Sequence, residues 1–167
     1  AGDSIASGGA NNVTVGKNAG TAITTGDQNV LVGQAAGDAL TTSSNNVAIG
    51  NLALSADTLG GRSVAIGASA LATQNFTSST NAYNTAIGFT AGTSVTTGTN
   101  NTFVGSRSGD AVTSGLANVA VGDEALGAET QGQRSVAVGV GALFNQNTTS
   151  ATDVYNTAVG HAAGNQV

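Results

Sequence analysis

The sequence predicts an all-β fold in which the chain winds as a parallel β-solenoid, or β-roll, of about nine coils. A short motif that closes in Val-Gly or Ile-Gly occurs nine times, with its anchor glycines at Gly16, Gly33, Gly50, Gly67, Gly88, Gly105, Gly122, Gly139 and Gly160. The steps between successive anchors are 17, 17, 17 and 21, and the same series then repeats from Gly88 to Gly160. Fixed periods of this kind are typical of solenoids, in which each repeat forms one coil and stacks on its neighbours.

The repeats cover nearly all of the 167 residues, so we treat residues 1–167 as a single β-solenoid repeat segment. Residues 1–10 look like the end of an earlier coil, and the residues from His161 onward look like the start of another. We therefore expect the segment to belong to a longer fibrous protein.

Each anchor glycine closes a three-residue pattern that is typical of a short β-strand. The residue directly before the glycine is Val or Ile in all nine units, and the residue three before it is Val or Thr. β-Branched residues at alternating positions predict a strand with one face turned inward.

The position between these two residues, two before the glycine, is apolar in eight of the nine units. Strands that are apolar on both faces occur in sheets that are covered on both sides. Because a slender solenoid has only one inside, we expect a second copy of the chain to cover the other face, with small alanines allowing close approach near a symmetry axis. The predicted interface residues are Ala48, Ala65, Ala86, Phe103, Ala120, Ala137 and Ala158.

Two turn signals divide each coil into two short extended segments. Gly or Leu stands four residues after each anchor, alternating in pairs, and Gly, Asn, Ser or Asp stands seven before it. Glycine and short polar residues tolerate turns and left-handed backbone. Asn or Ser, four before each anchor, is expected to hydrogen-bond to neighbouring coils or to cap a turn. With strands about 4.8 Å apart, nine coils would form a rod on the order of 40 Å long.

The composition argues against several classes of function. Four Lys or Arg against nine Asp or Glu give a net charge of −5, which is too acidic for a nucleic-acid-binding surface. The chain has no Cys and one His, which leaves no nucleophile–base pair, and no apolar run is long enough to cross a bilayer. Asp123-Glu124 is the only adjacent carboxylate pair, and it falls at a variable surface position. We expect a non-enzymatic protein without cofactor, metal site, nucleic-acid partner or membrane insertion.

The two longer units carry their extra residues at the same place, in residues 73–83 and 145–155. Insertions in a solenoid form loops on one face, which is often the binding face. Aromatic and amide side chains are typical of carbohydrate contacts, and the candidate contact residues are Asn75, Phe76, Tyr83, Gln146, Asn147 and Tyr155. The alternative is that each longer loop braces a neighbouring chain.

Charged residues also recur at equivalent places in the two halves of the series. Arg62 follows Asp57 by five residues across a turn, and Arg134 follows Glu129 in the same way. We expect each arginine to form a salt bridge, with the preceding acid in its coil or with another chain.

The motif RSVAIG of residues 62–67 resembles the head repeats of YadA-like trimeric autotransporter adhesins. The fuller pattern NTAIGFTAG of residues 84–92, followed by Thr96-Thr97-Gly98 and Asn101, is similar to repeats in tail-fibre and virion structural proteins of marine phages. The resemblance implies left-handed β-rolls packed as a homotrimer in a virion tail fibre. Other fibre proteins and a host cell-surface glycan or protein would be its partners. The alternative is the head segment of an adhesin on the bacterial surface.

A third interpretation is an ice-binding β-solenoid, because Thr pairs recur on several coils, at residues 24–25, 41–42 and 96–97. The pairs are missing from the coils that contain Leu71 and Leu143, so no flat Thr array runs the full length. We rank this interpretation below the two adhesive ones.

Overall fold

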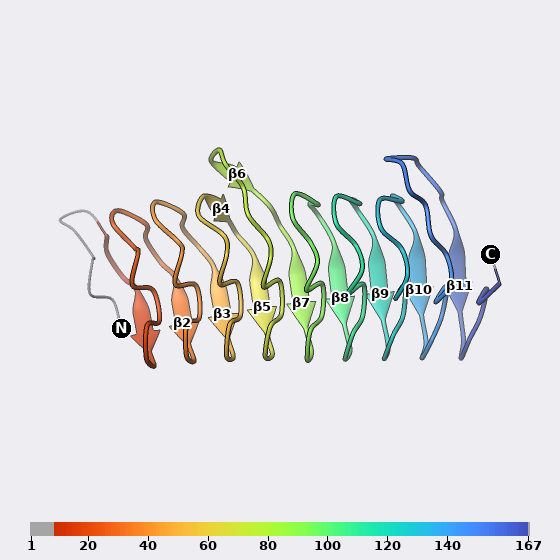
Figure 1. The fold of residues 1–167 in the computed structure, drawn as a ribbon, viewed down its shortest axis with the longest axis horizontal. Coiled ribbons are helices and arrows are strands. Elements are labelled where there is room, and N and C mark those ends of the chain that lie inside the picture. The colour runs from red at the N-terminus through yellow and green to blue at the C-terminus, as the bar shows by residue number, and fades with distance from the viewer. Residues whose placement is uncertain (1–8, 167) are drawn as a thin grey trace.

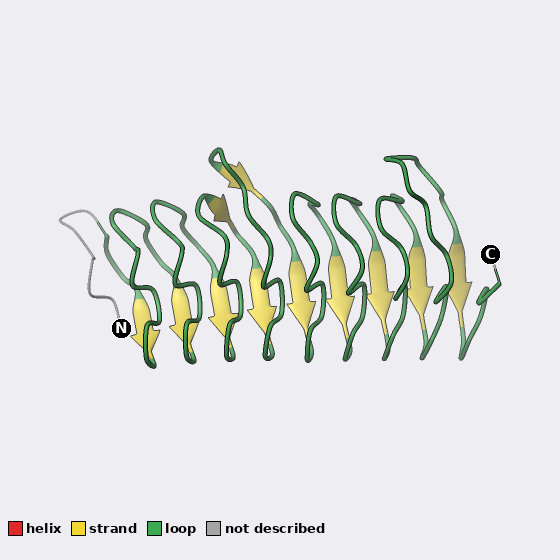
Figure 2. Ribbon diagram, in the orientation of Figure 1, coloured by secondary structure: helices red, strands yellow, loops and turns green. Residues whose placement is uncertain are grey.

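A computed structural model describes residues 9–166 of the chain as a row of stacked coils without any helix (Figure 1). Each coil contributes one three-residue strand to a nine-stranded parallel sheet that runs along one wall of the rod (Figure 2). These strands are β1 (Val13–Val15), β2 (Val30–Val32), β3 (Val47–Ile49), β5 (Val64–Ile66), β7 (Thr85–Ile87), β8 (Thr102–Val104), β9 (Val119–Val121), β10 (Val136–Val138) and β11 (Thr157–Val159). The predicted fold class, an all-β parallel solenoid of about nine coils, is confirmed.

Neighbouring strands pair at equivalent positions, so each residue of one coil stacks on its counterpart in the next. Ala65 pairs with Ala86, for example, and Ala86 pairs with Phe103. No helix that could span a membrane occurs in residues 9–166.

The two longer units interrupt this regular outline. In Figure 1 the loop that carries β6 (Thr80–Asn81), and later the loop that leads into β11, extend beyond the level of the other coils. In the first of these, β6 pairs in parallel with β4 (Gly60–Gly61) of the preceding coil. The second has a single bridge at the same place, between Gln133 and Asp153. We call residues 73–83 the first long loop and residues 145–155 the second long loop.

The anchor glycines are required by the closeness of the coils. Gly122 has φ 133°, and a Cβ added there would lie 2.5 Å from the carbonyl oxygen of Gly139 in the next coil. The same collision recurs along the stack, for example between Gly105 and the carbonyl of Gly122. A side chain would therefore meet rigid backbone in a conformation that L-residues rarely adopt. This is why the glycine is present in every unit.

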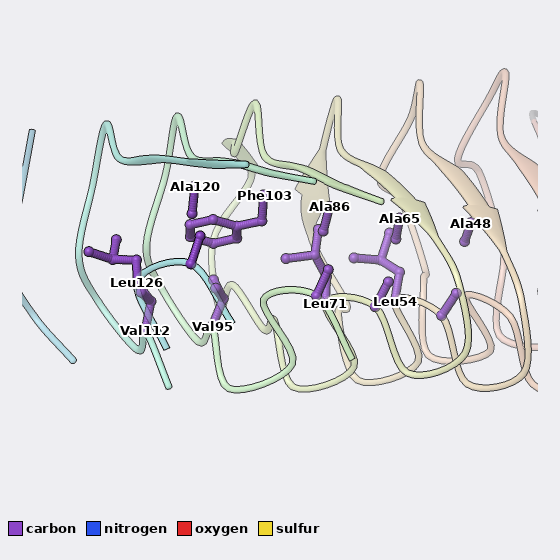
Figure 3. Packing of buried hydrophobic residues seen from close by; sticks show 14 of the residues in the cluster. Ala48, Leu54, Ala65, Leu71, Ala86, Val95, Phe103, Val112, Ala120 and Leu126 are labelled. Carbon is purple, nitrogen blue, oxygen red and sulfur yellow. The ribbon is translucent and has the colours of Figure 1, made fainter. Parts of the chain in front are cut away.

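Much of the interior is filled by two facing rows of side chains whose sizes are complementary, and Ile23, Leu40, Val95 and Val112 form a further buried row (Figure 3). One row comes from the middle residue of each strand and the other from the residue four after each anchor. Where the strand contributes Ala48, Ala65, Ala120 or Ala137, the facing row of the same coil contributes leucine, at Leu54, Leu71, Leu126 and Leu143. Where the strand contributes a large residue, the facing row contributes glycine.

Phe103 shows the second case most clearly. A Cβ added at Gly92 or Gly109 would lie 2.8 or 2.5 Å from the ring of Phe103, so this single ring occupies the space of two missing side chains. Leu31 lies against Gly20 and Gly37 in the same way. One large side chain thus fills the space beside two successive glycines, as dense packing of the interior requires. This explains why Gly and Leu alternate in pairs along the facing row.

This packing corrects the predicted interface between chains. The middle residues of the strands point into the solenoid, and they are fully covered by their own chain, apart from 8% exposure of Ala158 near the end of the stack. Sequence reasoning took the wrong face of the strand for the outer one, because both faces are apolar. The residues concerned are Ala48, Ala65, Ala86, Phe103, Ala120, Ala137 and Ala158.

A ladder of asparagines joins the coils beside the sheet, as predicted. The side-chain oxygen of Asn101 accepts from the backbone N–H of Asn118 at 3.0 Å, and its side-chain nitrogen donates to the carbonyl of Gly115 at 2.9 Å. The same pair of bonds is made by Asn12, Asn29, Asn46, Asn84 and Asn118. Each amide is buried or nearly so and fully paired, which removes the cost of burying it.

Candidate functional site

The outward side of the nine-stranded sheet is a continuous row of β-branched residues. It consists of the first and third residue of each strand, and we call it the outer sheet face. Its side chains are half-buried or exposed, with Ile49 at 37%, Ile87 at 38% and Val15 at 55% exposure. Nine strands of three residues span about 40 by 10 Å, or roughly 400 Å². A contiguous apolar patch of that size on a soluble chain commonly marks an interaction surface.

Further apolar side chains lie at the corner that follows the sheet. Phe89 and Val140 come directly after anchor glycines, and they are 57% and 49% exposed. Leu52, at the same corner of an earlier coil, is 40% exposed. These residues extend the apolar surface beyond the strands themselves.

Each long loop lies next to an arginine and carries a tyrosine at its end. The guanidinium of Arg62 lies 5.9 Å from the ring centre of Tyr83, and Arg134 lies at the same distance from Tyr155. The two arrangements are copies of one another, one in each long unit.

The charges around the two arginines differ. Arg134 forms an ion pair with Asp153, whose carboxylate also accepts a hydrogen bond from the Tyr155 hydroxyl at 2.9 Å. Asp153 raises the pKa of Arg134. Arg62 instead donates from Nε to the side-chain oxygen of Asn81 at 3.1 Å, and it forms no ion pair within residues 9–166.

The salt bridges expected between Asp57 and Arg62 and between Glu129 and Arg134 do not form. Both acids are fully buried beneath the long loops. Asp57 accepts from the backbone N–H groups of Gly60 and Phe76 at 2.9 and 3.2 Å, and from the side chain of Gln74 at 2.5 Å. The carboxylate thus ties the loop to the preceding coil, and its partners are amides instead of a guanidinium.

Glu129 does the same in the second long unit. It accepts from the backbone N–H groups of residues 130, 131, 132 and 148 and from the side chain of Gln146 at 2.7 Å. Gln74 and Gln146 also continue the asparagine ladder where serine interrupts it. Gln74 donates to Ser63 at 3.1 Å and accepts from Asn84 at 2.8 Å.

The predicted contact residues of the long loops fall into two groups. Tyr83 and Tyr155 are 51% and 65% exposed, and Asn75 and Asn147 are exposed as well. Phe76 and Gln146 are 6% and 3% exposed, and they brace the loop from inside. Only the first group is therefore placed to touch another molecule.

A polar cleft of about 180 Å³ lies beside the first long loop, between the turn at residues 42–45 and the loop residues 79–81. Leu59, Gly61 and Arg62 complete its lining. Sequence reasoning missed it, because the cleft joins segments that belong to different coils and lie far apart along the chain. The only available signal was the set of hydroxyl and amide residues at both places.

Three other charged residues, Arg107, Asp123 and Glu124, form surface pairs between coils. Arg107 lies 2.8 Å from Glu124 and 3.5 Å from Asp123, so the adjacent carboxylate pair holds an arginine of the preceding coil. Exposed pairs of this kind contribute about 0–1 kcal/mol. Within residues 9–166 no group of three or more His, Cys, Asp or Glu lies close enough to hold a metal ion.

The first threonine of each predicted pair is engaged within the stack, as is Thr113, whereas the hydroxyls of Thr25, Thr42 and Thr97 make no such bond within residues 9–166. The hydroxyls of Thr24, Thr41, Thr96 and Thr113 each donate to the backbone carbonyl of the equivalent residue in the next coil, at 3.0–3.2 Å. They stabilise the contact between coils, and this gives them a structural role that does not require ice.

Comparison of the chain with known protein families, with curated proteins and with solved structures found no match.

Proposed function

We propose that the chain is a non-enzymatic structural and adhesive shaft of a homotrimeric phage tail fibre. The observation that carries the proposal is the outer sheet face, an uninterrupted row of Val, Ile and Thr along the whole described rod. Every copy of the chain carries the same row, so apolar strips of equal length and strand spacing can be buried against one another. Three as the number of chains, and the virion as the location, come from the resemblance of the repeat motif.

The rod geometry supports a mechanical role. Stacked coils are joined by backbone bonds, by the asparagine ladder and by interior packing, so each added coil adds length and rigidity. Association of three chains would repeat every exposed loop three times around the axis. Weak contacts made by Tyr83 and Tyr155 with a host surface would then add up to useful avidity.

The association is tested by mass in solution, measured by light scattering after size exclusion. The wild-type chain should have about three times its 16.0 kDa mass. Val104→Asp and Val121→Asp, each in the centre of the outer sheet face, should shift the mass toward the monomer. Val104→Thr controls for loss of folding because Thr already occupies this face. Ser78→Asp, in the exposed first long loop, is the matched charge control and should leave the mass unchanged.

The biological assignment needs a separate experiment. An antibody raised against the purified chain should label the tail fibres of virions that carry its gene, as seen by electron microscopy. Label on the surface of bacteria that carry the gene, without virions, would place the chain among adhesin heads and refute the phage assignment.

A further inference from the structure

The polar cleft beside the first long loop brings hydroxyl and amide side chains of two coils next to Arg62. It is lined by residues 42–45, 59, 61–62 and 79–81, of which most carry hydroxyl or amide side chains. The hydroxyl of Ser43, among these residues, is covered and has no hydrogen-bond partner within residues 9–166. A volume of about 180 Å³ is smaller than the roughly 300–1,000 Å³ of sites for drug-sized ligands. The cleft therefore suits one unit of a chain molecule, such as one sugar ring.

The charge in the cleft comes from Arg62 alone among the lining residues. A guanidinium carries five N–H donors, and the bond from Nε to Asn81 is the one hydrogen bond that Arg62 makes from its side chain within the described residues. Its remaining donors are available to an anionic group, which arginine binds with two parallel hydrogen bonds when the group is planar or has several oxygens. The ring of Tyr83, which is half exposed, lies against the same guanidinium, with 5.9 Å between Cζ of Arg62 and the ring centre.

The second long unit shows what the cleft looks like without these features. At the equivalent places in that unit, Ser43, Ser44, Asn45 and Ser79 are replaced by Gly115, Leu116, Ala117 and Ala151. Asn81 is replaced by Asp153, which pairs with the equivalent arginine. The second unit keeps hydroxyls at Ser114 and Thr152 and gains the amides of Gln131 and Gln133, but it loses the polar side chains of the turn together with the available positive charge. This joint difference points to a ligand that needs both.

We propose that the first cleft binds an acidic sugar unit, in which Arg62 pairs with a carboxylate or sulfate group and the hydroxyl and amide residues contact the ring hydroxyls. The proposal names a ligand class for the host-surface contact proposed above. Its biological meaning rests on that proposed function, whereas binding of the sugar in the cleft does not. The binding measurement does not depend on how many chains associate, so the two proposals can fail separately.

The test is a titration of the isotope-labelled chain, followed by NMR, with four probes: sodium glucuronate, glucose 6-sulfate, glucose and sodium acetate. One of the two acidic sugars should bind with a dissociation constant near the millimolar range and shift the signals of Arg62 and Asn45. Glucose and acetate should each bind at least tenfold more weakly. The tighter of the two acidic sugars identifies the preferred acid group. Equal shifts with acetate and the acidic sugars would show charge pairing only and would overturn the proposal, as would no saturable shift.

Variants of the chain test whether the acidic sugar binds in this cleft. Asn81→Asp installs the acid of the second unit and should weaken the acidic sugar at least tenfold, and Arg62→Gln should do the same. Asp153→Asn, in the second unit, is the matched control and should change nothing, because Gly115, Leu116 and Ala117 stand there in place of the polar turn residues 43–45. Light scattering and circular dichroism on each variant separate lost binding from lost folding or association. Unchanged binding by a folded Asn81→Asp chain would refute the proposal.

Discussion

The pairing of Phe103 with two glycines predicts a strong and specific coupling within the core. Phe103→Ala empties the space above Gly92 and Gly109 and should lower the free energy of unfolding by about 3–5 kcal/mol. Gly109→Leu alone places a Cβ 2.5 Å from the ring. Overpacking costs about 1–3 kcal/mol, and left-handed backbone with a side chain costs about 1–2 kcal/mol more. If the two effects were independent, the double variant would lose about 5–10 kcal/mol.

The double variant Phe103→Ala/Gly109→Leu should instead lose only about 2–3 kcal/mol. Its new pair reproduces the arrangement of Ala65 with Leu71 in the same chain, where Leu71 already has φ 49°. The added leucine fills most of the cavity, so the remaining loss is mainly the backbone cost. The coupling energy between the two sites should therefore reach about 2 kcal/mol or more, within the range seen for residues in contact.

Urea unfolding followed by far-ultraviolet circular dichroism measures this cycle at one fixed protein concentration, because association of chains shifts apparent stability. Phe103→Leu is the control. It copies Leu31 of the earlier unit, which also lies against two glycines, and should cost less than Phe103→Ala. A double variant that loses the full sum of the single losses would refute the idea that the two interior rows compensate one another in size.

Three further predictions concern the backbone, the buried acids and pH. Gly122→Ala should lower the free energy of unfolding by about 2–6 kcal/mol, because the new side chain is strained by the positive φ and collides with Gly139. Gly141→Ala is the control, because the space around Gly141 is open, and it should lower that free energy by about 1 kcal/mol. Thermal unfolding compares the two variants. Asp57→Ala leaves the buried N–H groups of Gly60 and Phe76 without an acceptor and should lower the free energy of unfolding by about 1–3 kcal/mol for each group. Hydrogen exchange of these two amides should become faster. Unchanged exchange there would contradict the role given to this carboxylate. Burial raises the pKa of Asp110 above its usual value of 3.8. The folded state therefore keeps this proton to a higher pH than the unfolded state does, and the free energy of unfolding falls as the pH rises from 3.8 through the raised pKa. Asp110→Asn should therefore raise the unfolding temperature at pH 7 and leave it unchanged at pH 3, and equal shifts at both pH values would contradict this origin.

The architecture was predictable because its signals are local and repeated. The anchor glycine and the alternating β-branched residues recur in every coil, and together they predict the strand, the turn and the stacking. Their spacing also predicted that two units in the described chain carry longer loops, as β6 and the bridge at Gln133 confirm.

The inward face of the strand was assigned wrongly because hydrophobicity does not distinguish the two faces here. A better signal was variation in size. The middle position changes from Ala65 to Phe103 while the facing row changes from Leu71 to Gly109, as expected for a core of constant volume. The third residue of each strand, on the outer face, stays Val or Ile throughout.

The buried acids were misread because their charge suggested a surface pair. Asp57 and Glu129 both stand seven residues after an anchor, where other coils carry Ile23, Leu40 or Val95. Alignment of the units would have placed them in the interior. The polar cleft, in contrast, depends on how the first long loop folds back over the turn at residues 42–45, and no local pattern in the sequence predicts that approach.

The most direct test of the central claim, that the outer sheet face is buried between identical chains, is thiol accessibility in a chain that has no cysteine of its own. Ile87→Cys lies on that face, where the side chain is 38% exposed in the single chain, and Ser78→Cys lies in the exposed first long loop. We expect the thiol at position 87 to react far more slowly than the thiol at 78 and to react faster as dilution separates the chains. A thiol at 87 that reacts at one rate at every concentration, in a chain with the mass of a monomer, would contradict it.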